Sequence, residues 1–284
     1  MARTAALSIY VSEGVKAELI NKIGGVFENL AKNTVSGKLK SKNSAENVKA
    51  GSIEYKRFAN AASQTYGTAR TAGAGQKLIA PPIVVNLDQN KEIVEEVNAF
   101  DGAAFTEEDL QAFLARRQVA IQQSVARDLD REFFAAAKTG GTKGADISKA
   151  KKIREQIGDI IVSLEKTKTD YVDGVEREQM ALVCSPDLYQ AIKNELNDCY
   201  NFAGTTADEV FKGLDGVAAF SSNRLPSGVD YVLMTMDSIA QPVMMTDADV
   251  EKIPLSNEMA VEIFYRYGAK VLAQELVIYG GLTA

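Results

Sequence analysis

The chain of 284 residues is 46% hydrophobic and 25% charged, fractions that are ordinary for a globular protein and exclude a disordered or collagen-like chain. It contains no histidine, no tryptophan and two cysteines, Cys184 and Cys199. The sequence therefore lacks the residues required for Ser-His-Asp or Cys-His catalysis and for a four-ligand zinc site. These absences argue against a conventional hydrolase and against a structural zinc site.

The net charge of −6 is distributed unevenly along the chain. Residues 1–80 contain 12 basic and 5 acidic residues, a net charge of +7, whereas residues 81–284 contain 20 basic and 33 acidic residues, a net charge of −13. A basic segment on an acidic body could meet nucleic acid, an acidic partner or a second copy, or remain solvated. No stretch reaches the ~20 apolar residues of a membrane span, and no signal peptide is recognised, so we expect synthesis in the cytoplasm.

The first 50 residues predict an arm. Apolar residues over 12–32 recur at helical spacing, which predicts an amphipathic helix weakened at Gly24-Gly25. Residues 33–50 are polar and rich in lysine, without apolar periodicity, and predict a linker or extended segment.

Residues 51–82 predict a long hairpin. The segments 52–58 and 78–87 suit strands, and Pro81-Pro82 places the second strand at a sheet edge. The connection between them is rich in glycine and small polar residues. Because it has nothing to bury in its own domain, we expect it to reach onto another molecule.

The strongest predicted helix covers residues 106–138, with Thr106 as N-cap and Asp109 three positions later in a variant capping box. Such a helix is about 50 Å long at ~1.5 Å per residue. Its apolar stripe consists of Leu110, Leu114, Ile121, Val125, Leu129 and Phe133. The facing polar stripe is mixed in sign, which suits solvent or a neighbouring subunit, and consists of Arg116, Arg117, Arg127, Asp128, Arg131 and Glu132.

The rest of the chain mixes helices and strands without a regular βαβ rhythm, which favours an α+β fold. Helices are predicted over about 149–166 and from Ser185-Pro186, where serine is the N-cap and proline the first helical residue. Strands are predicted at 180–184, 217–221, 230–236 and 241–246, and the apolar run 260–278 is broken at Gly268.

Candidate chemical sites are few. The glycine-rich segments 73–75 and 140–144 lack the spacing of nucleotide-binding loops. Asp247, Asp249 and Glu251 alternate and could attract calcium on a strand, but a solvated turn is favoured because the other features of a calcium loop are missing. Cys184 lies in an apolar run and is interpreted as a buried hydrophobic residue.

The basic residues of the hairpin offer two interpretations. Lys56, Arg57, Arg70 and Lys77 occur with nearby aromatic residues, a combination that could contact phosphates without sequence preference. Salt bridges to the acidic body of a neighbouring subunit explain the same residues more economically. We therefore predict Lys56, Arg57, Arg70, Lys77, Arg116 and Arg117 as inter-subunit contacts.

The order of these elements resembles the major capsid proteins of tailed bacteriophages of the Hong Kong 97 type. The resemblance rests on arrangement through nearly the whole chain, including the closing segment 261–272. It implies a peripheral domain over 83–149 and 243–269, containing the spine helix 106–138. It also implies an axial domain over 150–242 and 270–284, besides the arm (1–50) and the extended hairpin loop (51–82).

The resemblance implies a shell protein of the virion that assembles through pentamers and hexamers around double-stranded DNA, bound without sequence specificity. In this family the hairpin lies over a neighbouring subunit. A separate scaffolding protein and a portal protein are implied as partners, with no membrane and no cofactor. The resemblance also implies a protein that is not an enzyme and has no catalytic, cofactor-binding or metal-binding residues. Crosslinking through Lys56 or Lys77 is not expected.

Two alternatives to a phage capsid remain open. An encapsulin, a nanocompartment shell protein of the same fold, is the closest rival. An α+β enzyme or ligand-binding domain that uses carboxylates such as Asp247 or Glu251 is the rival of another class.

Overall fold

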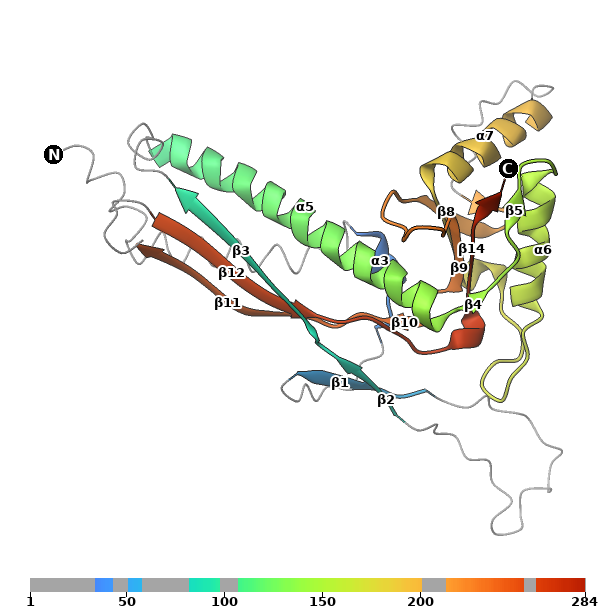
Figure 1. Ribbon diagram of the computed structural model, residues 1–284, viewed down its shortest axis with the longest axis horizontal. Helices are drawn as coiled ribbons and strands as arrows, with labels where there is room; N and C mark the ends of the chain where they lie inside the picture. Colours follow the sequence, from blue (N-terminus) through green and yellow to red (C-terminus); the bar gives the residue numbers. More distant parts are fainter. Residues whose placement is uncertain are drawn as a thin grey trace, which may run out of the picture. The chain divides into compact units, whose positions relative to one another are not determined.

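A computed structural model describes residues 34–42, 51–57, 82–97, 107–200, 213–252 and 259–283 (Figure 1). The chain divides into two compact units. The first unit comprises Met1–Lys38, Leu87–Asp130 and Pro242–Gly268, and the second comprises Leu39–Asn86, Arg131–Gln241 and Ala269–Ala284. The predicted helix over 12–32 and the predicted N-cap Thr106 lie outside the described residues. Among the described helices, none is both long and apolar enough to cross a membrane.

The first unit contains a three-stranded antiparallel sheet covered on one face by a long helix. The strands are β3 (Gln89–Val97), β11 (Val243–Lys252) and β12 (Met259–Tyr267), in the order β11-β12-β3. The helix α5 (Glu107–Gly140) belongs to this unit as far as Asp130 and runs along the sheet in Figure 1.

Alternation along β12 determines which face of the sheet meets the helix. Val261, Ile263 and Tyr265 are buried, and the Tyr265 hydroxyl donates a hydrogen bond of 3.0 Å to the Asp128 carboxylate on α5. Since side chains alternate along a strand, Arg266 points to the opposite face, where it is exposed. The sheet therefore has one face against α5 and one face toward solvent.

Helix α5 confirms the long helix predicted over 106–138. Ile121, Val125, Leu129 and Phe133 are buried, as their helical spacing predicts, while the side chains of Leu110 and Leu114 lie outside the described residues. Directly after the helix, a Cβ atom at Gly141 would lie only 2.5 Å from the carbonyl oxygen of Ala137. The turn out of the helix thus requires a glycine.

A short helix, α3 (Val35–Leu39), occupies part of the predicted linker 33–50, so the expectation of an irregular segment there was wrong. Thr34 Oγ1 accepts a hydrogen bond of 2.9 Å from the Gly37 amide, and Asp130 on α5 accepts one of 3.0 Å from the Ser36 amide. Leu39 is fully buried. A helix of five residues is too short to show apolar periodicity in the sequence. The hydrogen bonds to Thr34 and Asp130 stabilise it instead.

The second unit contains a mixed six-stranded sheet in the order β4-β14-β9-β6-β8-β7. Its strands are β4 (Thr142–Lys143), β14 (Val277–Gly280), β9 (Tyr231–Thr235), β6 (Met180–Cys184), β8 (Val217–Ser221) and β7 (Gly213–Leu214). The strands predicted at 180–184, 217–221 and 230–236 are therefore confirmed. Strand β6 runs parallel to β8 and antiparallel to β9, which makes the sheet mixed.

Helices α6 (Ile153–Glu165) and α7 (Pro186–Tyr200) confirm the two helices predicted in this region. Side chains of both helices share one apolar cluster with alternate residues of β6 and β9, so both pack on the same face of the sheet. Helix α7 begins after Ser185, whose Oγ accepts the Leu188 amide at 3.4 Å.

The start of α6 is stabilised by α7. Lys152 precedes α6 and makes no side-chain capping bond, and Glu195 on α7 accepts hydrogen bonds from the amides of Ile153 and Arg154 at 2.9 and 3.3 Å. A carboxylate there also complements the helix dipole. Nothing in the sequence near Ile153 indicates this cap, because Glu195 lies 42 positions away along the chain.

Short elements complete the second unit. They are β5 (Ile147–Ser148), paired with β15 (Leu282–Thr283), β10 (Ile239–Ala240), paired with β13 (Lys270–Val271), and the 3-10 helices η2 (Arg177–Gln179) and η3 (Gln274–Leu276).

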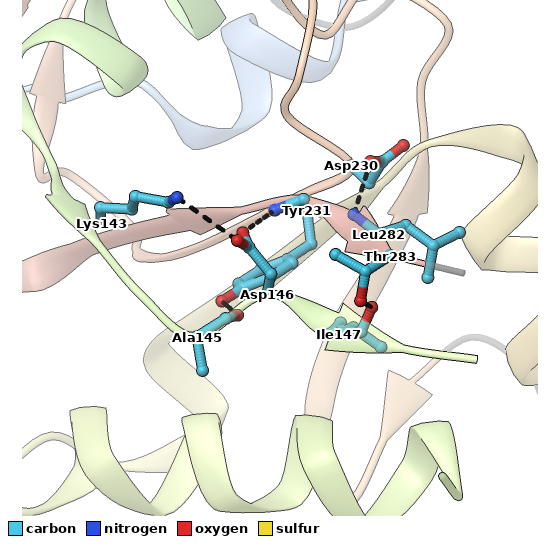
Figure 2. Close-up of polar contacts among 9 residues, drawn as sticks. Lys143, Ala145, Asp146, Ile147, Asp230, Tyr231, Leu282 and Thr283 are labelled. Atoms are coloured by element: carbon cyan, nitrogen blue, oxygen red, sulfur yellow. Dashed lines mark hydrogen bonds and ion pairs between the residues drawn. The ribbon is translucent and has the colours of Figure 1, made fainter. Parts of the chain in front are cut away.

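The C-terminal strands are held by a polar network, drawn in Figure 2. Asp230 Oδ2 accepts a hydrogen bond of 2.7 Å from the Leu282 amide, and Asp146 Oδ1 accepts one of 2.9 Å from the Gly281 amide. The bond from Gly281, with the nearby Lys143 ammonium, lowers the pKa of the Asp146 carboxyl. The two carboxylates satisfy backbone amides that would otherwise lack partners at the end of the sheet.

Tyr231 is buried at the centre of this network. Its hydroxyl donates a hydrogen bond of 2.6 Å to the Ala145 carbonyl (Figure 2). A Cβ atom at Gly280 would lie 2.5 Å from the Tyr231 ring, and one at Gly144 would lie 2.7 Å from its hydroxyl. The ring thus fits only because two glycines leave room for it.

The alternating acids of the segment Asp247–Glu251 lie within β11, not in the favoured turn, so that interpretation was wrong. Asp249 is in register with Glu262 and Asp247 with Phe264, after a register shift at Met245. Pairing with the aromatic and β-branched strand β12 overrides the weak strand preference of aspartate. No group of three or more potential metal-ligating residues occurs in the described part of the chain.

Candidate functional site

The predicted hairpin begins as a two-stranded ribbon, which confirms both of its strands. Strand β1 (Ser52–Tyr55) pairs antiparallel with β2 (Ile83–Asn86), with Tyr55 opposite Ile83. The connection over 58–81 lies outside the described residues. Pro82 directly precedes β2, as expected of a residue that cannot donate a ladder hydrogen bond.

One face of the ribbon packs on other elements of the second unit, to which the ribbon belongs. Tyr55 and Val85 are buried with Ala240 in a small apolar cluster, against which Ile53 and Leu272 also pack. On the other face Glu54 is exposed and Val84 is 39% exposed. The ribbon therefore has a buried face and an unpartnered face among the described residues.

Arg57 fastens the end of β1 to two distant segments. Its guanidinium forms an ion pair with Glu275 in η3 and lies 4.4 Å from the centroid of the Tyr171 ring. Lys270 adds a hydrogen bond of 3.1 Å from its ammonium to the Val84 carbonyl on β2. Half-exposed ion pairs and cation–π contacts each contribute up to about 1 kcal/mol, so this attachment is weak.

A cavity of about 320 Å³ lies beside the ribbon. Its lining includes Tyr55, Lys56, Arg57, Tyr171, Met236 and Asp237. The lining mixes apolar, hydroxyl-bearing, cationic and anionic side chains. A lining of this kind can receive a side chain or a peptide segment.

The arginines predicted on the spine helix differ in their surroundings. Arg117 donates a hydrogen bond of 2.8 Å from Nε to Glu95 Oε2 on β3, and this bond, with the charge of Glu95, raises the pKa of the guanidinium. Arg116 is exposed and has no carboxylate partner among the described residues.

The residues of the predicted polar stripe on this helix, which is mixed in sign, differ in exposure. Asp128 is half-buried and bonded to Tyr265, and Glu132 is half-buried, whereas Arg116, Arg127 and Arg131 are exposed. The hydrogen bond from Tyr265 holds Asp128 against the sheet, whereas the side chains of these three arginines lie at the surface.

The six predicted contact residues are divided between the two units and the part of the chain that the structure does not describe. Lys56 and Arg57 belong to the second unit and Arg116 and Arg117 to the first, while Arg70 and Lys77 lie outside the described residues. Arg57 and Arg117 form ion pairs within their own chain. Contact of these residues with a neighbouring subunit stays a prediction.

Sequence reasoning missed the residues that anchor the ribbon. Tyr171, Lys270 and Glu275 are more than 100 positions from the strands that they hold, and no local pattern marks them. The interpretation of Cys184 as a buried hydrophobic residue is confirmed, since it is fully buried and burial raises the pKa of its thiol to about 12. A thiol with that pKa is not a nucleophile near neutral pH.

Comparison with protein families gives one match over most of the chain. A family model described as phage capsid protein matches residues 92–277, a range that includes α5, the six-stranded sheet as far as Val277 and β12. No curated protein matches the chain.

Solved structures with the same fold include several phage capsids. The capsid of cyanophage P-SCSP1u is 12% identical, with 88% of each chain covered and a TM-score of 0.61. Gordonia phage Cozz is 11% identical, with 88% and 87% of the two chains covered and a TM-score of 0.60. Mycobacterium phage Che8 is 17% identical, with 81% and 84% covered and a TM-score of 0.54. At these identities the likeness concerns the fold.

Proposed function

The chain belongs to the phage capsid protein family and is a major capsid protein, and we propose that it assembles through pentamers and hexamers into the icosahedral shell around a double-stranded DNA phage genome. Its α+β fold is of the Hong Kong 97 type. The encapsulin alternative is less favoured, because the matching family is one of phage capsid proteins. The protein is a structural component of the virion capsid. We propose that it has no catalytic activity.

The observation that best supports assembly is the ribbon at the base of the hairpin. Strands β1 and β2 pair only with each other among the described strands. A two-stranded ribbon is marginally stable by itself in water. One of its faces remains exposed at Val84, so a neighbouring subunit can add the missing contacts.

Charge supports the same arrangement. The connection over 58–81 contains Arg70 and Lys77 and no acidic residue, whereas residues 81–284 carry a net charge of −13. We propose that Lys56, Arg70 and Lys77 contact the acidic body of an adjacent copy. Arg57 acts indirectly, by holding the ribbon in the position from which the hairpin extends.

The remaining partners follow from the proposed shell. Assembly of a closed shell by this design calls for a separate scaffolding protein and a portal protein, and the packaged DNA is held without sequence specificity. We propose that synthesis and assembly take place in the host cytoplasm.

Electron microscopy tests the shell directly. The full chain, co-expressed with the scaffolding protein of the same phage, is expected to form closed particles of several hundred ångströms. A preparation that yields only small soluble species under these conditions contradicts the proposal.

Limited proteolysis tests the hairpin contact. Trypsin is expected to cleave the unassembled subunit after Arg70 and Lys77 and to spare both positions in assembled particles. Lys40 is the internal control, because it follows the fully buried Leu39 and precedes the buried Ser41 and should be spared in both states. Equal cleavage at Arg70 and Lys77 in the two states counts against the contact.

A further inference from the structure

The cavity beside the ribbon lies entirely within the second unit, because every residue of its lining belongs to that unit. The lining includes the end of β1 and three segments that are distant from it along the chain: residues 171–172, 235–238 and 272–276. The volume of about 320 Å³ is at the small end of the range for ligand sites, roughly 300–1,000 Å³. The cavity therefore suits a small ligand with one or two rings.

Part of the lining is apolar. Four half-buried aliphatic side chains contribute to it: Ile83, Val172, Leu272 and Leu276. The rings of Tyr55 and Tyr171 add aromatic surface. A ligand with an apolar body would remove its own surface and that of these side chains from water, which favours binding.

The Tyr55 hydroxyl is a donor that lacks an acceptor. Tyr55 is 4% exposed and lines the cavity, and its hydroxyl makes no hydrogen bond with a described residue. Among the described residues, the one fully enclosed side-chain polar atom without a partner is Ser36 Oγ, so the Tyr55 hydroxyl still reaches open space. Burial raises the pKa of Tyr55 above its ordinary value of 10.0, so the hydroxyl keeps its proton near neutral pH. A ligand oxygen in the cavity would supply the missing acceptor.

Two cationic side chains follow Tyr55 and also line the cavity. Lys56 is exposed and forms no ion pair with a described residue. Arg57 contacts Glu275 and the Tyr171 ring, and a guanidinium has five N–H donors, so some of its donors remain for a ligand. Consecutive residues thus offer O–H and N–H groups at one end of the cavity.

One carboxylate belongs to the lining. Asp237 Oδ1 accepts a hydrogen bond of 3.1 Å from the Lys42 amide, which uses part of its acceptor capacity. In number, its charge balances that of Lys56, as Glu275 balances Arg57. The unused donors, and not a net charge, therefore select the ligand. Donors of this kind bind a charged oxygen most strongly.

We propose that this cavity binds a small organic acid with an apolar body, such as an aromatic carboxylate, and that the bound acid fastens the ribbon to the rest of the second unit. The carboxylate accepts hydrogen bonds from Tyr55 and Lys56, and the apolar body lies against Leu272 and Leu276. The acid thereby joins the end of β1 to the segment that Arg57 reaches through Glu275. Binding requires only the folded subunit and does not depend on the proposed function.

The first test measures binding of naphthoate to the unassembled full chain by ligand-observed NMR titration. Saturable binding with a Kd on the order of 1 mM is expected for a ligand of this size. Y55F keeps the ring and removes the hydroxyl, so the affinity should fall about tenfold. K56Q removes the ammonium and should lower it about threefold. The matched control is K42Q, which removes an exposed lysine outside the lining and should leave the affinity unchanged.

Several results of this titration would overturn the site. They are absence of saturable binding to the parent chain, an unchanged affinity in Y55F, and a loss in K42Q as large as that in K56Q. Naphthylmethylammonium has the same apolar body with the opposite charge and should bind more weakly than naphthoate. Equal or tighter binding of this cation would mean that Asp237 selects the ligand, and the assignment to an acid would be wrong.

The second test measures whether the acid fastens the ribbon. Hydrogen exchange of the β1 and β2 amides, followed by mass spectrometry, should slow by up to about tenfold at a naphthoate concentration of about ten times the Kd, because the acid binds only the closed ribbon. Helix α6 is the internal control, since none of its residues lines the cavity, and its exchange should not change. Unchanged exchange in the ribbon of the saturated chain overturns the fastening.

Assembled particles distinguish a free acid from a side chain of an adjacent copy. Naphthoate is expected to bind particles and unassembled chain with the same affinity. Loss of binding on assembly would mean that a neighbouring copy fills the cavity, and would overturn a free acid as its occupant. Failure of the parent chain to form particles would contradict the proposed function, while the titration of the unassembled chain still decides whether the cavity binds the acid.

Discussion

The hairpin base and the C-terminal strands both belong to the second unit, and they are held in different ways. The C-terminal strands pair with β9, β4 and β5, and a fully buried Tyr231 packs against Gly280 between them. The ribbon of β1 and β2 pairs with itself, packs through one small apolar cluster, and is fastened by Arg57 and Lys270 at its surface.

This difference suggests that the C-terminal strands contribute to the stability of the subunit, whereas the ribbon contributes to contacts between subunits. Carboxylates, amides and the phenol at the C-terminal end find partners inside the same chain. The ribbon keeps an exposed face, and we expect the core to remain folded when its anchor is lost. Substitutions at the C-terminal network should therefore unfold the subunit, whereas those at the hairpin base should impair assembly with little effect on folding.

The largest effect is expected at Tyr231. Y231A removes a fully buried ring and should lower the free energy of unfolding of the unassembled subunit by about 3–5 kcal/mol, measured by urea denaturation. Y231F keeps the ring and loses the hydrogen bond to Ala145, so about 1 kcal/mol is expected. Equal losses in both variants would show that the hydroxyl, and not the packing, stabilises this end of the sheet.

Gly280 gives the next largest effect. The added methyl group of G280A would lie 2.5 Å from the Tyr231 ring, and overpacking of this kind lowers the free energy of unfolding by about 1–3 kcal/mol. The matched control is G158A within α6, where no atom lies within 4 Å of the new Cβ. This control should stabilise the subunit by up to about 1 kcal/mol, because alanine favours helix. Destabilisation of both variants to the same extent would argue against a specific clash.

Alkaline pH should weaken the C-terminal network through the same tyrosine. Burial and the Asp146 charge raise the pKa of Tyr231 from 10.0 to about 12. The unfolded chain then loses this proton first, so stability that is present below pH 10 falls as the pH rises toward 12. Relative to Y231F, the native chain should lose roughly 2 kcal/mol more between these pH values, from urea denaturation at each pH. Parallel pH profiles for the two proteins would contradict this assignment.

The smallest effect on folding is expected at Arg57. R57A removes one half-exposed ion pair and one cation–π contact, so the free energy of unfolding should fall by about 1 kcal/mol or less. The yield of closed particles should nevertheless drop severalfold, as counted by electron microscopy, because the base of the hairpin loses an anchor. R154A breaks the exposed pair with Asp215 at 3.0 Å and serves as the matched control, with particle yield unchanged. If R57A instead lowers the free energy of unfolding as much as Y231A, the hairpin base and the C-terminal strands contribute equally to the stability of the subunit.

The sequence by itself determined the elements whose partners are close along the chain. Helical spacing of Ile121, Val125, Leu129 and Phe133 gave the buried face of α5, and apolar runs bounded by turn residues gave β6, β8 and β9. Ser185-Pro186 marked the start of α7. The order of these elements was sufficient to indicate the family. Such features depend on local periodicity and capping, which a sequence displays directly.

Only the tertiary structure decided the elements and charges whose partners are distant. Helix α3 is fixed by Asp130, the start of α6 by Glu195, and the ribbon by Glu275 and Tyr171. Strand β11 includes an acidic segment because β12 pairs with it. The sign of the exposed stripe on α5 was also hidden, since a sequence shows where charges lie along a helix and does not show which of them are engaged by other elements.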